Sequence, residues 1–120
     1  MEILTTIIQI LVPAGILNVW LLRGSKSTAY RGGQARTLKE EFQTYGLPEA
    51  VFYIVGFFKI TAALAIWAGF LFPPLLPLGA AVLALLMAGA ISMHIKVGDP
   101  AKKFIPATVM LLLSLWLFLA

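Results

Sequence analysis

Four long apolar segments constrain this chain more than any other feature of its sequence. They cover about residues 3–22, 48–71, 75–95 and 104–120 of the 120 residues, and a membrane-spanning helix needs about 20 mainly apolar residues. The chain is 61% hydrophobic and 12% charged, with a mean hydropathy of +0.97, outside the usual range of soluble domains. We therefore expect an all-α membrane protein, a single four-transmembrane-helix bundle with no separate soluble catalytic domain.

The connections between these segments favour a compact bundle. Phe72 is followed by Pro73 and Pro74, and two successive prolines end one helix and let the next begin after a very short turn. The second and third spans are thus predicted to form an antiparallel hairpin. The first span begins Met1-Glu2 and lacks the positive start and small-residue cleavage site of a signal peptide. We interpret it as a retained helix.

The loop between the first two spans predicts a short amphipathic helix. Thr37 and Glu40 have the T-x-x-E spacing of a capping box, in which two side chains satisfy free amide groups at a helix start. Apolar and aromatic residues then recur at helical spacing: Leu38, Phe42 and Tyr45. We expect an interfacial helix over about residues 38–45. A partner-docking segment or a lid that gates a substrate is the alternative.

The positive charges predict how the bundle is oriented. Eight of the nine lysines and arginines lie in two loops on the same side of a four-span protein, and the positive-inside rule places that side in the cytoplasm. We expect the bacterial inner membrane, with both termini outside. The net charge of +4 indicates attraction to anionic lipid in the bilayer and gives no reason to expect nucleic acid. The eight are Arg23, Lys26, Arg31, Arg36, Lys39, Lys96, Lys102 and Lys103.

The ninth cation, Lys59, lies in the middle of the second apolar segment. A lysine at the bilayer midplane costs about 3 kcal/mol unless it finds polar partners, so it is a candidate site residue. At about 1.5 Å of rise per residue, Ser114 and Gln9 lie at a depth similar to that of Lys59. Pro13 cannot donate to the Gln9 carbonyl, so that carbonyl is also available as a partner. No acidic residue lies at this depth. Burial without an acid favours a neutral amine that can donate to a quinone, exchange protons or form a Schiff base. A structural lysine bonded to backbone carbonyls or internal water is the alternative.

A second polar group, His94 with Asp99, falls at the loop end of the third span. A histidine near a helix C-terminus is favoured by the helix dipole alone. The functional alternative is a proton-handling or headgroup-binding site built from His94, Asp99 and the basic first loop. The chain has one histidine and no cysteine, which are too few ligands for a typical metal site, so we expect no metal. Without cysteine, any redox role must use a bound organic cofactor or a partner, and a quinone is the candidate cofactor.

The third span carries small residues at intervals of four, namely Ala80, Ala84, Ala88 and Ser92. Small residues on one stripe let helix backbones approach closely in lipid. We expect this stripe to serve packing within the bundle, and a face for a homo-oligomer is the alternative.

Residues along nearly the whole chain match one family: the run Gly56–Leu64, Pro73-Pro74, the stretch Met87–His94 and Gly98-Asp99. In these the chain resembles the DoxX-like family of small four-span membrane proteins. The resemblance implies a four-helix membrane bundle in which Lys59 and His94 occupy the positions of the family's polar landmarks. The family's founders are similar to subunits of thiosulfate:quinone oxidoreductase, other members are associated with oxidative-stress complexes, and distant relatives include a eukaryotic receptor-assembly chaperone. The family has no common set of catalytic residues that could be assigned to positions of this chain.

Three functions follow as hypotheses. In the first, the chain is a membrane subunit of a redox system that holds a quinone or lipid near Lys59 while a soluble redox partner docks on the basic loops. Such a subunit of a quinone-linked oxidoreductase need not be catalytic itself. In the second, it is an assembly or scaffolding factor for membrane proteins. In the third, it is a small transporter, a reading weakened because Glu2 is the only acidic residue near the first span.

Overall fold

The computed structural model describes residues 2–25 and 30–120, and helices are the regular secondary structure found there. Four helices are long and apolar enough to cross a membrane, which confirms the predicted all-α bundle. The first of these spans joins α1 to a π-helix, η1. The elements are α1 (Ile3–Leu17), η1 (Asn18–Leu22), α2 (Leu38–Thr44), α3 (Glu49–Ala68), α4 (Leu75–Lys96) and α5 (Ala101–Leu119).

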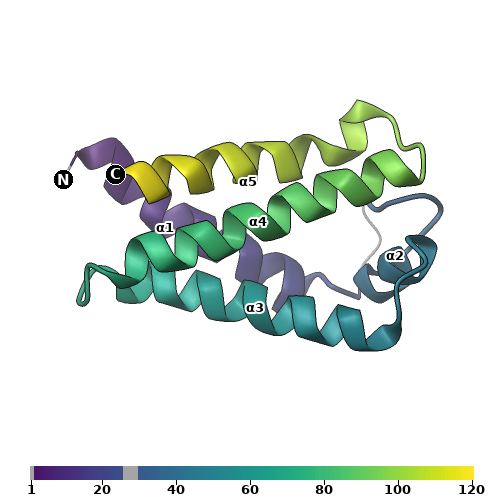
Figure 1. Ribbon diagram of the computed structural model, residues 1–120, viewed down its shortest axis with the longest axis horizontal. Coiled ribbons are helices and arrows are strands. Elements are labelled where there is room, and N and C mark those ends of the chain that lie inside the picture. Colours follow the sequence, from purple (N-terminus) through teal and green to yellow (C-terminus); the bar gives the residue numbers. More distant parts are fainter. Residues whose placement is uncertain (1, 26–29) are drawn as a thin grey trace.

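The helices pack so that α4 lies between α3 and α5, while α1 crosses the bundle obliquely (Figure 1). Near the termini α1 lies beside α5, and toward the other end it diverges from α5 and approaches α3. The short helix α2 lies across that other end, which we call the α2 end. Among the loop cations, Lys26 lies outside the described residues, and the other seven lie at the α2 end.

The core forms where the helices meet, and small residues let α3 and α4 approach closely. A Cβ at Gly79 would lie 2.8 Å from the carbonyl oxygen of Ala62, so the two backbones pack with no room for a side chain there. Ala63 and Ala80 are completely buried at the same contact. The small-residue stripe on α4 is divided, since Ala80 and Ala84 are buried whereas its continuation toward the α2 end is exposed.

The helix that was predicted in the first loop forms α2 and covers the end of the bundle. The side chain of Thr37 accepts a hydrogen bond from the Glu40 N–H at 3.1 Å, as a capping residue does. The Glu40 carboxylate reaches back to the Arg36 N–H at 3.4 Å, one residue before the position expected in a capping box. Leu38 and Phe42 are buried on its inner face.

Two helix ends differ from the sequence-based bounds. The second span ends at Ala68, because Gly69 to Pro74 form the turn into α4. The fourth span begins at Ala101, three residues before the predicted start, because Pro100 has the extended backbone of a helix N-cap. The lysines of its first turn delay the apolar segment in the sequence but do not delay the helix.

Candidate functional site

Lys59 lies on α3 with its amine against an aromatic cluster. Its Nζ is 5.4 Å from the centroid of the Trp20 ring, within range of a cation–π interaction. The indole is stacked on Phe52 at 5.3 Å and meets Phe42 edge-on at 5.9 Å. A Cβ at Gly56 would lie 2.6 Å from Trp20 Cζ3, so this glycine provides the space for the ring. One turn of α3 thus supplies both the room for the indole and the cation beside it.

The π-helix η1 carries Trp20, and the chain leaves the first span at Arg23, three residues later. π-helical segments inside α-helices are rare and frequently occur at functional sites. Because Lys59 reaches Trp20, its amine lies closer to the α2 end than its backbone does, as long cationic side chains in membranes commonly do.

Two residues expected near Lys59 lie elsewhere in the core. Gln9 Nε2 donates to the carbonyl oxygen of Ile66 at 2.9 Å, and Ser114 Oγ donates to that of Met110 at 2.7 Å. Neither side chain lines the cavities described next. Equal depth of the backbone therefore does not bring these side chains to the amine of Lys59.

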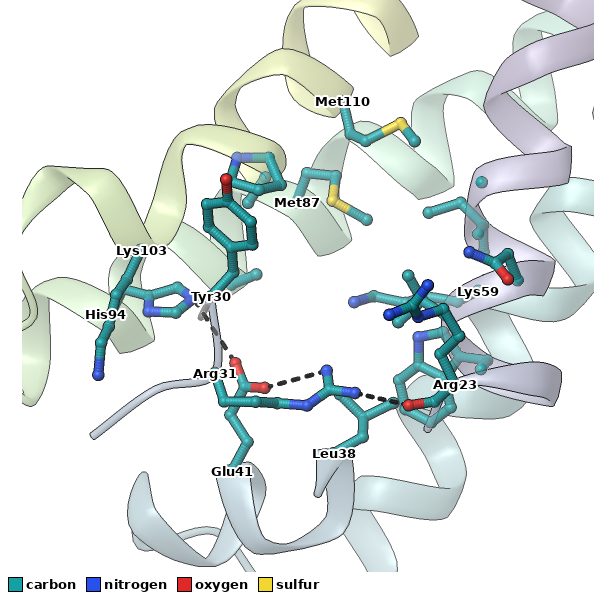
Figure 2. Close-up of a pocket in the computed structure, with 18 residues that line it drawn as sticks. Arg23, Tyr30, Arg31, Leu38, Glu41, Lys59, Met87, His94, Lys103 and Met110 are labelled. Carbon is teal, nitrogen blue, oxygen red and sulfur yellow. Dashed lines mark hydrogen bonds and ion pairs between the residues drawn. The ribbon is translucent and has the colours of Figure 1, made fainter. Parts of the chain in front are cut away.

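Two cavities meet at Lys59. The larger, of about 390 Å³, lies between α1, η1, α4 and α5 at the α2 end, and the smaller, of about 240 Å³, lies between α2, α3 and α4. Lys59, Glu41, Leu38 and Ala90 line both cavities and so form the boundary between them. Figure 2 shows the larger cavity, with Lys59 and Arg23 on one side.

Glu41 supplies an acidic group near Lys59, although the depth of residues along the spans predicted none there. It is buried on α2, accepts a hydrogen bond from Tyr45 Oη at 2.5 Å, and lies 3.6 Å from the Arg31 guanidinium. The signal was present in the sequence, since Glu41 follows Leu38 by three residues and precedes Tyr45 by four. Those spacings place all three on one face of a helix.

His94 and Asp99, both predicted as site residues, are in contact. His94 Nδ1 lies 2.8 Å from Asp99 Oδ2, while Nε2 lies 3.3 Å from Tyr45 Oη and 3.6 Å from Glu41 Oε1. The buried ring thus connects a carboxylate in the α4–α5 loop with one on α2. Burial, then the bond to Glu41, raises the pKa of Tyr45, so the hydroxyl remains a donor.

Asp99 also joins the first loop to the last. Its Oδ1 accepts a hydrogen bond from the Gly33 N–H at 3.0 Å, and Lys103 Nζ, 3.8 Å from that oxygen, donates to the Gly33 carbonyl at 2.6 Å. Burial opposes the charged carboxylate, but the Gly33 N–H, His94 and Lys103 outweigh it and lower the pKa of Asp99. The ionised carboxylate therefore holds the loops together at neutral pH.

The larger cavity has a polar end and an apolar end. Glu41 and Arg31 lie across the polar end, with Tyr30 and His94 opposite Lys59, whereas the methionines lie toward the bundle interior (Figure 2). Within residues 2–25 and 30–120, no group of three or more His, Cys, Asp or Glu is arranged to hold a metal ion. The arrangement suits an amphiphilic molecule with a polar head and an apolar tail. The apolar lining comprises Gly15, Ile16, Val19, Met87, Ala90, Pro106, Ala107 and Met110.

Fold and site together define an integral membrane protein, a four-helix bundle with a partly open cavity between its helices at one end. The family model of the DoxX-like family matches residues 12–117, and the chain belongs to that family. This match confirms the resemblance noted in the sequence. Searches among curated proteins and among solved structures found no match.

Proposed function

We propose that the protein is a ligand-binding membrane subunit that holds a quinone or a lipid in the larger cavity beside Lys59. The main support for this proposal is the position of the Lys59 amine. It lines a cavity of about 390 Å³ and donates no hydrogen bond to any residue that the structure describes. A lysine kept in an apolar segment for structural reasons would use its donors on carbonyl or carboxylate groups. This amine is available to a bound molecule.

The lining of the cavity supports the same ligand class. The amine of Lys59 and the side-chain amide of Asn18 can donate to carbonyl or headgroup oxygens, and both line the wall. Beyond them, Met87 and Met110 offer flexible apolar side chains that adapt to a ring or an alkyl chain. A membrane-soluble amphiphile satisfies both ends of the cavity at once.

A redox role would require a second protein. The chain has no cysteine and few redox-active side chains. Electrons would therefore have to reach a bound quinone from a partner protein. With the α2 end in the cytoplasm, its basic loops would face a soluble redox protein, and acidic groups on that protein would suit them.

Native mass spectrometry with quinone and lipid extraction tests the proposal on gently solubilised protein. The wild type should retain one small molecule per chain, and Lys59→Met should lose it. Lys102→Met is the matched control, because Lys102 is exposed on α5 and lines neither cavity. Lys59→Met should keep or raise the melting temperature, since it removes an amine that donates no hydrogen bond to the part of the chain that the structure describes. An empty wild type, or equal retention in all three proteins, would overturn the proposal.

An assembly or scaffolding role is the second candidate, and one observation favours it. Ala88 and Ser92 continue the small-residue stripe of α4 but are exposed on the outside of the bundle. Small residues on a lipid-facing surface suit close packing of a helix from another chain. In that case Ala88→Phe should reduce recovery of membrane partners after crosslinking while leaving any bound small molecule in place. Unchanged recovery would argue against it.

A further inference from the structure

We infer that the larger cavity selects an amphiphile with an anionic headgroup, a phosphate or carboxylate, seated between Arg23 and Lys59. The inference rests on the proposed ligand-binding function and names the class of ligand. Its source is the bilayer itself, with an acidic phospholipid entering sideways between η1 and α5. Four observations support it, namely the charge balance, the position of Arg23, the apolar lining and the direction in which the cavity opens.

The first observation is that the cavity holds more cations than the protein neutralises. All five acidic residues of the chain are described, and none forms an ion pair with Arg23 or Lys59. Glu41, the carboxylate lining the cavity, is already paired with Arg31 and hydrogen-bonded by Tyr45. The other acids are engaged elsewhere or lie outside the cavity: Glu2, Glu40, Glu49 and Asp99.

The second observation is the position of Arg23 at the end of η1. Its backbone is fixed, because its N–H donates to the Asn18 carbonyl at 2.8 Å and its carbonyl accepts from Arg31 at 2.9 Å. Its guanidinium forms no hydrogen bond or ion pair with any residue that the structure describes, and it lines the cavity. Figure 2 draws Arg23 and Lys59 on the same side of the cavity, facing its polar end.

Arg23 is exposed and Lys59 is partly buried, so the wall offers an outer and an inner cation to one anion. Charge-assisted hydrogen bonds from a guanidinium and an ammonium to one phosphate or carboxylate would be about twice as strong as neutral ones. The Asn18 amide on the same wall can donate a further bond. The site therefore has the donors of an anion site, and none of the described carboxylates pairs with Arg23 or Lys59.

The third observation is the apolar lining of the cavity, which favours a lipid over a free ion. Inorganic phosphate would satisfy the cations but leave the apolar lining empty. That lining includes Ile16, Met87, Ala107 and Met110, a surface suited to an alkyl chain. An alkyl chain that moves from the bilayer into this lining stays in apolar surroundings. A headgroup attached to a chain uses the whole cavity.

The fourth observation is the side on which the cavity opens, because it determines how a lipid could enter. The cavity is lined by η1 and α5, the helices flanking the side where α1 diverges from α5 (Figure 1). Arg23 lies just beyond the last residue of the first span, at the depth where the headgroups of the adjacent leaflet begin. An acidic lipid in that leaflet can slide its headgroup onto Arg23 and Lys59 without leaving the membrane.

Lipid exchange on the full-length protein tests the inference. Delipidated protein in neutral detergent is offered phosphatidylglycerol, phosphatidylcholine with the same acyl chains, or inorganic phosphate, and occupancy is read by native mass spectrometry. The wild type should prefer phosphatidylglycerol over phosphatidylcholine by about fivefold or more, the contribution of one cation near the membrane surface. Arg23→Gln should reduce the preference by about fivefold, because Lys59 remains, and Arg23→Lys should keep most of it.

Arg36→Gln is the matched control, since Arg36 is an exposed cation of the same loop that lines neither cavity. The Arg36→Gln protein should prefer phosphatidylglycerol as strongly as the wild type does. Equal binding of both lipids by the wild type, or equal loss in Arg23→Gln and Arg36→Gln, would overturn the inference while leaving a ligand-binding bundle. Retention of inorganic phosphate without lipid would overturn the lipid as ligand. If the wild type binds neither lipid here and also retains no quinone or lipid in the extraction experiment described above, the proposed function itself would be overturned.

Discussion

The side chain of Lys59 shows how an apolar segment accommodates one cation. Its stem runs along the bundle until the amine reaches the ring of Trp20, 5.4 Å away, near the end of the first span. Lysines bury their methylene groups in this way and keep the charged end near polar surroundings. The amine therefore lies nearer the membrane boundary than the backbone of Lys59 does, where the larger cavity also has its polar end.

Gly56→Ala should destabilise the protein, because a Cβ at this position would lie 2.6 Å from Trp20 Cζ3. Overpacking a helix contact costs about 1–3 kcal/mol, which should appear as a lower melting temperature in detergent. Gly89→Ala is the control. A Cβ there meets no atom within 4 Å, and alanine favours a helix by up to about 1 kcal/mol, so its stability should be unchanged or higher. Equal losses in both variants would contradict the packing of the indole on Gly56.

At the scale of elements, α2 is tied to its neighbours by polar contacts in addition to its buried face. Lys96 on α4 donates to the Tyr45 carbonyl at the end of α2 at 2.9 Å, and Lys39 on α2 pairs with Glu49 of α3 at 2.6 Å. The buried pair of Glu41 and His94 adds a third connection. Because Glu41 and Leu38 line both cavities, the position of α2 sets the shape of the site.

Acid should loosen the contact between the first and last loops through Asp99. The pKa of Asp99 is lowered in the folded protein, so its contribution to stability is fully present above the ordinary value, about 3.9. The contribution is lost as the pH falls from there through the lowered value. Thermal unfolding measured from about pH 6 down to about pH 2 should show this loss in the wild type below about pH 4, and Asp99→Asn should remove that part of it.

Glu2→Gln is the control for the acid series, because Glu2 is an exposed acid at the opposite end of the bundle. It should keep the acid sensitivity of the wild type. An Asp99→Asn protein with an unchanged acid profile would show that the bonds to Gly33 and His94 contribute nothing to the folded state in solution.

At the scale of the whole molecule, the features predictable from the sequence are those with a periodic or compositional signal. Span length and hydropathy predict four helices, and the spacing of Thr37 and Glu40 predicts α2, because these depend on residues close in the chain. The π-helix has no such signal, since it changes the hydrogen-bond register without a change in composition. The pairing of Lys59 with Trp20 also escapes prediction, because a depth count follows the backbone and ignores the reach of a long side chain.

The orientation of the bundle can be tested over the whole molecule, because the chain contains no cysteine and a single introduced cysteine becomes the only reporter. Gln34 in the first loop and Phe72 in the α3–α4 turn are both exposed and lie at opposite ends. The seven described loop cations at the α2 end predict that this end faces the cytoplasm. A membrane-impermeant maleimide applied to intact spheroplasts should therefore label Phe72→Cys and leave Gln34→Cys unlabelled until the cells are lysed. Labelling of Gln34→Cys alone in intact spheroplasts would reverse the orientation, and a cytoplasmic redox protein could not then reach the basic loops.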